Sequence, residues 1–387
     1  MGWGRLAGTG LLCGLSLMVA LLAGEWMVRY LAPQKMYRFP RGMFENHPTL
    51  QYRLAPGFVG VSNTVEFQTH IRTNRLGLRA DREYGRKGPK TFRMLFLGDS
   101  FTMGVGVEQD ETYGEVLARR LMEGGRTSLQ TPSPTYEVIN AGVPGYNTQQ
   151  ALTYLRESGL ALEPDLVVLG FYLGNDIAEN FAMPSVSVQD GYLQSGAPAQ
   201  GMLPAPLRRY LALNSHLYQL LWPYQRWLVD RSRWVRKERQ RLQRRLAIYV
   251  PEPDNDTGAL WDATRRQVAA MAEITRSHGV PLAVVIIPEM VQVDPQLWHK
   301  MIQPMASNDT TYQADWPNRR LVALCHEHHL PVFDLLPVFA QAGTDEPWYL
   351  PLDGHWTRHG HAVAAVAIGT FLRQQQLLPV GGSLANR

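Results

Sequence analysis

The sequence of 387 residues contains only two cysteines, Cys13 and Cys325, and this scarcity limits the sites it can build. Two thiols cannot form a disulfide framework or a cysteine-rich zinc site. Charged residues make up 19% of the chain, and a net charge of +4 is far from the dense basic surface of a dedicated nucleic-acid-binding protein. We therefore expect no cysteine-rich metal site and no nucleic-acid partner.

Long apolar runs are also scarce, with one exception at the N-terminus. Residues 6–28 carry a single charged side chain, Glu25, and at 1.5 Å per residue they are long enough to cross the hydrocarbon core of a bilayer. No later stretch has the length and apolar character of a span. We predict a membrane anchor over residues 1–32 and a single-pass protein. The alternative is a cleaved signal peptide, although no A-x-A site closes the run.

Two signals for the orientation of this anchor disagree. Arg29, Lys35, Arg38 and Arg41 follow the span whereas only Arg5 precedes it, so the positive-inside rule places the body in the cytoplasm. The segment nevertheless stands where an export signal stands, and the chemistry described below suits a substrate outside the cell. We predict that the catalytic domain lies on the exported, periplasmic or extracytoplasmic, side.

The remainder of the chain alternates between apolar strand patterns and helical patterns. Residues 33–90 are expected to be a strand-and-loop lead-in, with weak strand alternation at 59–61 and 65–67. Residues 91–387 are expected to form one domain, because its β-α-β order predicts an α/β fold: a three-layer α/β/α sandwich with a parallel sheet. Its strands are predicted at 94–97, 136–139, 166–172, 282–287 and 331–335, and its helices at 111–122, 148–160, 315–328 and 359–372.

One long insert, residues 177–258, interrupts this alternation. Its first part is rich in Pro, Gly, Ser and Gln and is expected to be a loop at the rim of the site. Its second part has apolar residues at helical spacing and a basic opposite face that includes Arg236, Arg239 and Arg244. This face is either solvated or turned towards anionic lipid or an acidic polymer.

Four short polar segments occupy informative positions in this pattern. Three of them follow predicted strands and the fourth directly precedes the last helix: Gly98-Asp99-Ser100, Asn140-Ala141-Gly142, Gly174-Asn175-Asp176 and Asp353-Gly354-His355. The carboxyl ends of parallel strands share one edge of a sheet, and binding crevices form there. We therefore expect these segments to converge in space although more than 250 positions separate the first from the last.

The residue types at this edge are those that acyl transfer requires. Ser100, on a tight strand-to-helix turn, is the candidate nucleophile; His355 is the base, and Asp353 orients the histidine. The N–H groups of Ser100 and Gly142 and the side-chain amide of Asn175 are the candidate oxyanion donors.

Other interpretations of the same region are weaker. His355, His359 and His361 could suggest a metal cluster, but the spacing of the last two places them on different helix faces, and His361 is expected to pack or to cap a helix. The segment Gly104-x-Gly106 lacks the third glycine of a dinucleotide fingerprint. We expect neither a metal nor a cofactor.

At these residues the chain resembles the SGNH, or GDSL-type, hydrolase superfamily. FLGDSFTMG matches the family's Gly-Asp-Ser block, NAGVPG its glycine block, and LGNDIAEN its Gly-x-Asn-Asp block with one residue fewer between Gly and Asn. The family's last block has Asp three residues before His, whereas Asp353 is two before His355, and Asp-x-His-Trp-Thr is similar to the alginate O-acetyltransferase-like branch. The resemblance covers about residues 93–375. It implies a flavodoxin-like fold, no metal, and ester hydrolysis or acyl transfer.

These observations predict a serine esterase that uses Ser100, His355 and Asp353 on an ester or an acetylated carbohydrate. Two alternatives stay open. An O-acetyltransferase would form the same acyl-enzyme and modify a cell-envelope or exported polysaccharide, with a separate membrane protein supplying the acyl group. A catalytically inactive glycan-binding module is the other.

Overall fold

The structure is a computed structural model, and it separates into two compact units. The smaller unit comprises Met1–Arg38, Asn63–Glu66 and Ala197–Leu242, and the larger one comprises Phe39–Ser62, Phe67–Gly196 and Gln243–Arg387. The residues that the structure describes are 3–34, 36, 39–125, 134–195, 203–229, 242–243, 245–251, 255–303, 311–341 and 346–379.

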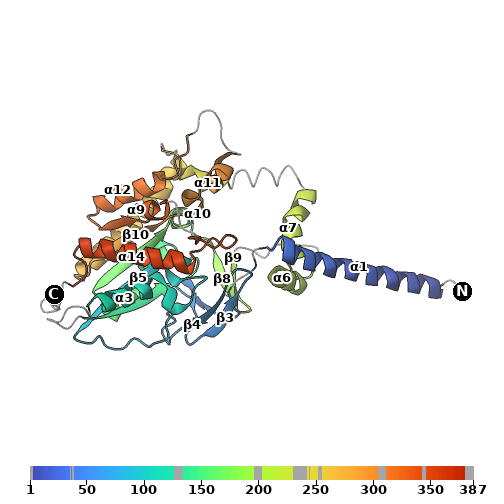
Figure 1. The fold of residues 1–387 in the computed structure, drawn as a ribbon, viewed down its shortest axis with the longest axis horizontal. Helices are drawn as coiled ribbons and strands as arrows, with labels where there is room; N and C mark the ends of the chain where they lie inside the picture. The colour runs from blue at the N-terminus through green and yellow to red at the C-terminus, as the bar shows by residue number, and fades with distance from the viewer. Residues whose placement is uncertain are drawn as a thin grey trace. The chain divides into compact units, whose positions relative to one another are not determined.

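The described helices of the smaller unit are α1 (Trp3–Leu31), α6 (Ala205–Asn214) and α7 (His216–Val229). In Figure 1, α6 and α7 lie beside the C-terminal part of the blue helix α1. Among the described residues, α1 is the one helix long and apolar enough to cross a membrane, over Gly8–Leu31. The prediction of an apolar N-terminal helix of spanning length is confirmed, and the side on which the body lies stays a prediction.

The larger unit is built on a parallel five-stranded sheet with the order β11-β10-β7-β5-β6. Its central strands are buried almost throughout, and apolar runs such as LAVVII in β10 are typical of strands covered on both faces. Gly98 is in register with Gly142, so β5 and β6 end side by side and bring two of the polar segments together. The strands are β5 (Thr91–Gly98), β6 (Thr135–Gly142), β7 (Leu166–Tyr172), β10 (Leu282–Ile287) and β11 (Val332–Asp334).

Helices cover both faces of this sheet. The helices α3 (Tyr113–Gly125) and α14 (Arg358–Gln374) pack side by side, and their apolar side chains share one core with the strands. The red helix α14 lies at the front of Figure 1. The other face carries α4 (Thr148–Tyr154), α5 (Asp176–Phe181), α9 (Asn255–Ser277) and α12 (Trp316–Glu327). This arrangement confirms the predicted three-layer α/β/α fold.

The lead-in forms two β-hairpins that pack on the loops after β5 and β6. These are β1 (Phe44–His47) with β2 (Gln51–Leu54), and β3 (Val59–Asn63) with β4 (Gln68–Arg72). Their buried side chains form an apolar cluster with Met103, Val105 and Tyr146 of the domain. The lead-in therefore lies against the segments expected to carry the chemistry.

The prediction of a strand at 65–67 is wrong. The chain turns there between β3 and β4, and Thr64 stabilises the turn by accepting the N–H of Glu66 on its hydroxyl at 3.2 Å. A hydroxyl that bonds the neighbouring backbone in this way competes with strand pairing.

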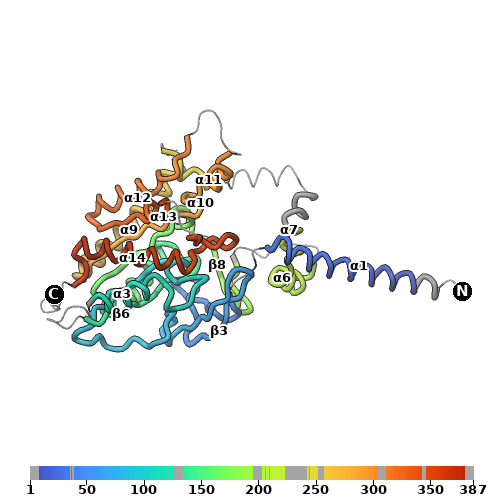
Figure 2. The backbone as a smooth tube through the Cα atoms, in the orientation of Figure 1, coloured from blue at the N-terminus to red at the C-terminus, as the bar shows by residue number. Residues whose placement is uncertain are grey.

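The insert is more structured than its composition suggests. After α5 it forms a hairpin of β8 (Val186–Gln189) and β9 (Tyr192–Ser195), which corrects the prediction of a loop. β8 contacts β1 and β2, and Figure 2 shows it next to the blue tube of the lead-in. The basic residues Arg236, Arg239 and Arg244 lie outside the described residues.

Candidate active site

Ser100 stands at the C-terminal end of β5 on a turn that requires glycine. Gly98 has a φ of +151°, and a Cβ there would lie 2.3 Å from the hydroxyl oxygen of Thr102. Asp99 then begins the short helix α2 (Ser100–Met103), because its carboxylate accepts the N–H of Phe101 at 2.9 Å. Within the described chain the N–H of Ser100 donates to no acceptor, which leaves it available at the site.

The three residues of the predicted triad meet at this turn. His355 Nε2 lies 2.6 Å from Ser100 Oγ across a sequence separation of 255 positions. The Nδ1 atom of the same ring makes a short contact with Asp353 Oδ1. Each of the three residues is buried, with 7–8% of its surface exposed. In this geometry the imidazole can take the serine proton while the carboxylate fixes the ring.

The segment Asp353-Gly354-His355-Trp356-Thr357 is held in place by several distinct contacts. Gly354 has a φ of +84°, which allows the tight turn between the carboxylate and the histidine. Trp356 is fully buried and packs against Phe101, whose ring also lies 4.8 Å from that of His355. Thr357 caps α14 by accepting the N–H of Gly360 at 3.2 Å. The local sequence therefore fixes the ring as well as supplying it.

His359 and His361 do not join the histidine of the triad. His359 stacks on Trp348 and pairs with Glu346, whereas His361 is fully buried and its Nδ1 accepts the N–H of Tyr113 at 3.3 Å. That N–H belongs to the first residue of α3, so His361 packs in the core and caps a helix. Burial lowers the pKa of His361 to about 3 and keeps this ring neutral.

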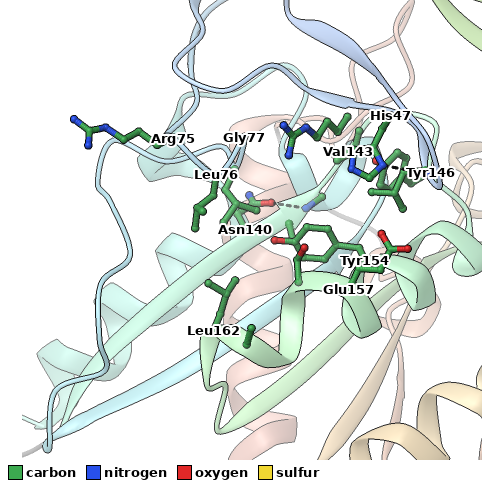
Figure 3. Close-up of a pocket in the computed structure, with 17 residues that line it drawn as sticks. His47, Arg75, Leu76, Gly77, Asn140, Val143, Tyr146, Tyr154, Glu157 and Leu162 are labelled. Carbon is green, nitrogen blue, oxygen red and sulfur yellow. Dashed lines mark hydrogen bonds between the residues drawn. The ribbon is translucent and has the colours of Figure 1, made fainter.

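Gly142 does not have the free N–H that its predicted role requires. It donates this N–H to Asn140 Oδ1 at 3.0 Å, the bond drawn at Asn140 in Figure 3. A Cβ on Gly142 would lie 2.3 Å from the backbone nitrogen of Met103, so the glycine serves the close packing of β6 against α2. This geometry contradicts the assignment of Gly142 as an oxyanion donor.

Gly145, three residues further along the same loop, has the free N–H. The N–H of Val143 donates to the carbonyl of Gly98, that of Tyr146 donates to Val143, and Pro144 has none. Gly145 is exposed, has a φ of +78°, and donates its N–H to no group of the described chain. The dipeptide Pro144-Gly145 is the signature of a type II turn, and this signal in the sequence could have identified the residue.

Asn175 lies directly before α5 with its amide partly committed. Its Nδ2 donates to Glu179 Oε2 at 3.3 Å, and its Oδ1 is buried without a partner among the described residues. An amide carries two N–H donors, so one remains for another acceptor.

Three carboxyl groups at or near the turn of Ser100 have raised pKa values. Burial raises the pKa of Asp99 to about 7, although the N–H of Phe101 opposes the shift. Burial and repulsion from Asp99 raise the pKa of Asp176 well above its usual range, and Asp176 accepts the N–H of Tyr172 at 3.0 Å. Burial also raises the pKa of Glu179 to about 7, opposed by its hydrogen bond from Asn175. Protons are therefore retained here close to neutral pH.

Changing Glu179→Gln is expected to flatten the pH dependence of stability. The folded pKa of about 7 exceeds the usual 4.5, so between these values the folded state holds a proton that the unfolded state releases. The free energy of unfolding therefore falls as the pH rises through this window, by up to about 1.4 kcal/mol per pH unit for one proton. Urea unfolding from pH 5 to 8 measures the slope. The exposed Glu123→Gln is the control, and equal slopes in both variants would contradict the shift.

A cavity of about 330 Å³ opens beside the loop that follows β6 and contains Gly145, and the triad residues do not line it. Figure 3 shows His47 and Leu76 of the lead-in on one side and Tyr154 and Glu157 on the other, with Asn140 in the wall. Asn140 also donates from Nδ2 to the carbonyl of Thr102 at 2.9 Å. One side chain thus joins this cavity wall to α2, the helix that begins with Ser100.

The model of the GDSL-like lipase/acylhydrolase family matches residues 96–363. This range covers more than half of the chain and includes Ser100, Asn175, Asp353 and His355. The chain belongs to the GDSL-like lipase/acylhydrolase family. The predicted superfamily and the prediction of an enzyme of ester chemistry are confirmed.

Solved structures similar to this family member share little sequence with it. They include an acetyl xylan esterase with 14% identity and a TM-score of 0.38, which covers 72% of this chain and 98% of its own. The lipase/acylhydrolase of Enterococcus faecalis has 15% identity and a TM-score of 0.35, with coverages of 73% and 96%. The esterase EstA of a Pseudoalteromonas species has 11% identity and a TM-score of 0.37, with coverages of 73% and 98%. No curated protein sequence matches.

Two residues of the lead-in, outside the range matched by the GDSL-like family, hold the turns of the site. Arg79 is buried and donates to the carbonyls of Met103, Gly104 and Val107, directly after the nucleophile helix. Tyr52 donates its hydroxyl to the carbonyl of Pro144 at 2.8 Å. The interpretation of the lead-in from composition missed both, because no local motif marks a contact with carbonyls more than 20 positions away.

Proposed function

We propose that this protein is a serine esterase whose triad is Ser100, His355 and Asp353. The proposal rests on the distance of 2.6 Å between His355 Nε2 and Ser100 Oγ. The serine oxygen attacks the ester carbonyl carbon while His355 takes its proton; the bond to the alcohol breaks, and His355 returns the proton to the leaving alcohol. Water then attacks the acyl-serine with His355 again as the base, which releases the acid and restores the serine.

The oxyanion of each tetrahedral intermediate would be held by the N–H groups of Ser100 and Gly145 and by the amide of Asn175. The free N–H of Gly145 supports this assignment. A crystal structure of the serine modified by a phosphonate tests it, because a true donor lies about 2.7–3.1 Å from the phosphoryl oxygen that mimics the oxyanion. A phosphoryl oxygen bound by Gly142, with the N–H of Gly145 turned away, would refute it.

Replacing Asn175 by alanine is expected to lower kcat for an aryl acetate by about 10²- to 10³-fold. The variant loses one hydrogen-bond donor to the developing negative charge, and removing one oxyanion donor usually lowers kcat by this factor. KM should change little, because the charge develops only in the transition state. Thermal unfolding of the same variant is the control for folding. A well-folded Asn175→Ala enzyme with an unchanged kcat would remove Asn175 from the site.

An acetylated carbohydrate is the proposed substrate class, and the same acyl-enzyme could also serve an O-acetyltransferase. The segment Asp353-x-His355-Trp356-Thr357 favours this second candidate through its resemblance to the acetyltransferase-like branch. Incubation of the full-length protein with an acetyl donor and a candidate glycan separates the two. Free acetate alone supports hydrolysis, whereas acetyl mass gained by the glycan supports transfer, in which case a separate membrane protein could supply the acyl group.

A fluorophosphonate probe tests whether the site is catalytic at all. Such probes react with an activated serine, so the full-length protein in detergent should be labelled at Ser100, and labelling should disappear in His355→Ala. If Ser100 stays unlabelled in the folded protein, the esterase proposal fails and the alternative of a catalytically inactive glycan-binding module survives.

We also propose that α1 anchors the protein in a membrane with the catalytic unit on the exported side. The apolar stretch Gly8–Leu31 supports the anchor. Protease treatment of intact spheroplasts should remove the catalytic unit if it is exported. Protection until the cells are lysed would place it in the cytoplasm, as the basic residues after the span suggest.

A further inference from the structure

Glu25 is the one acidic residue of α1, and it lies where α7 begins. Its carboxylate accepts the hydroxyl of Ser215 at 2.7 Å and the backbone N–H groups of His216 and Leu217, both at 3.0 Å. These are among the N–H groups that the first turn of a helix leaves without partners. Glu25 therefore caps α7 from a helix 190 positions away.

Arg29 completes this junction one turn further along α1. It pairs with Glu25 at 3.0 Å and donates to the carbonyl of Asn214 at 2.9 Å, at the end of α6. An ionised side chain in so apolar a helix is costly unless it is paired, and here the helix N-terminus and Arg29 both pair with it. Specific polar bonds thus hold α6 and α7 on α1.

A hollow of about 670 Å³ lies between α1 and this helix pair. Leu17, Leu21 and Leu22 line it from α1, and Leu217 and Leu221 line it from α7. Several of these side chains remain exposed, including Leu22 at 63% and Leu221 at 47%. The walls are mainly apolar, and the polar groups gather at the end marked by Glu25 and Arg29.

The hollow extends along the part of α1 that a bilayer would surround. It reaches from Glu25 back to Gly14, which is about 16 Å at the helical rise of 1.5 Å per residue. If α1 spans the membrane, the exposed leucines on both sides of the hollow face lipid tails. The side chain of Arg29 is 53% exposed at the other end, where an anionic headgroup would lie.

We propose that this hollow binds one membrane phospholipid, with an acyl chain along Leu17–Leu22 and the phosphate at Arg29. Apolar walls that end in an accessible cation match the two halves of that molecule. The proposal rests on the membrane anchor proposed above. In this proposal α6 and α7 form a lipid-facing helix pair beside the C-terminal end of α1.

Nitroxide labels on the full-length protein in phosphatidylglycerol liposomes test where the hollow opens. Native Cys13 is exposed on α1 and reports the span, whereas Cys325 is fully buried. Leu221→Cys in a Cys13→Ser background reports α7, and Val366→Cys on α14 is the aqueous control. Labels at 13 and 221 should both collide more with oxygen than with a water-soluble nickel chelate. A lipid-exposed label at 13 with an aqueous label at 221 would show that α7 does not face lipid, and would leave the anchor intact. An aqueous label at 13 would overturn the anchor, and with it the lipid-binding proposal.

Lipid retention tests the binding itself. Gly14 lines the hollow and Gly10 does not, and a Cβ at either position meets open space. Native mass spectrometry of the detergent-solubilised protein should therefore show one retained phospholipid in the wild type and in Gly10→Phe, with at least a fivefold loss in Gly14→Phe. Arg29→Gln should reduce retention of phosphatidylglycerol. Equal retention by Gly10→Phe and Gly14→Phe, or no retention by the wild type, would overturn the lipid-binding site. Neither result would bear on the proposed esterase activity.

Discussion

Replacing Ser100 by alanine is expected to lower kcat for a short-chain aryl acetate by about 10⁴- to 10⁶-fold. The hydroxyl that lies 2.6 Å from His355 Nε2 is lost, and no acyl-enzyme can form. The oxyanion donors and the binding surface stay in place, so slow attack by water remains the only route. Single-turnover and steady-state rates of the full-length protein in detergent measure the loss. The exposed Ser158→Ala is the matched control and should keep the wild-type rate.

His355→Ala should cost about as much as Ser100→Ala, and the double variant should be no slower than either single one. The two residues act as one unit, since the acyl-enzyme forms at the normal rate only when both the serine and its base are present. Multiplicative losses in the double variant would show that the two side chains work separately. Full activity of Ser100→Ala would mean that another residue is the nucleophile.

The sequence predicted the sheet and the convergence of Ser100 with His355 because both depend on strong local patterns. The strands β7 and β10 match their predicted limits, since each is an apolar run with a turn-forming residue within two positions of either end. Ser100 and Asn175 follow such runs directly, and the shared edge of a parallel sheet then brings them towards His355.

The errors arose where a distant or competing hydrogen bond decides the outcome. Gly142 ends a strand as predicted, yet its N–H donates to the side-chain oxygen of Asn140. The spacing of the motif does not reveal that hydrogen bond. At 65–67 the chain turns, and the hydroxyl of Thr64 accepts the N–H of Glu66 instead of leaving it to a strand partner. A different error concerns α9: no helix was predicted over residues 259–277, and the predicted insert, which ends at residue 258, overlaps only the first turn of this helix.

The lead-in is the clearest case in which composition is not enough. Its arginines, glycines and prolines suggest an accessory segment, but Tyr52 holds the loop of Gly145 and Arg79 holds the loop after Ser100. Both proposed backbone donors to the oxyanion thus depend on residues that precede the family match, which begins at residue 96. Preorganised donors are effective only when such supporting contacts keep them in place. The catalytic unit is therefore expected to need the lead-in.

Arg79→Ala is expected to lower the free energy of unfolding by about 3–5 kcal/mol and to lower kcat as well. Arg79 is 1% exposed, and its guanidinium donates to the carbonyl of Met103 at 2.9 Å and to those of Gly104 and Val107. Burial lowers its pKa to about 10, so the side chain is still charged at neutral pH. The truncation removes the guanidinium donor from three buried carbonyls. Those of Met103 and Gly104 then keep only long bonds of 3.4 Å, from Asn140 Nδ2 and from the N–H of Val107, so the penalty is substantial.

The loss of activity in this variant should appear in kcat and not in KM, because Gly104 closes α2 and its N–H bonds the carbonyl of Ser100 at 3.0 Å. A loosened α2 misplaces the nucleophile without altering the substrate surface. Arg79→Lys keeps the charge but not the planar set of donors, so it should recover only part of the stability and of kcat. Arg72→Ala removes an exposed arginine of the same lead-in and should change stability by no more than about 0.5 kcal/mol. Urea unfolding and steady-state kinetics on the three variants decide the matter: if Arg79→Ala resembles Arg72→Ala, the lead-in does not position the nucleophile.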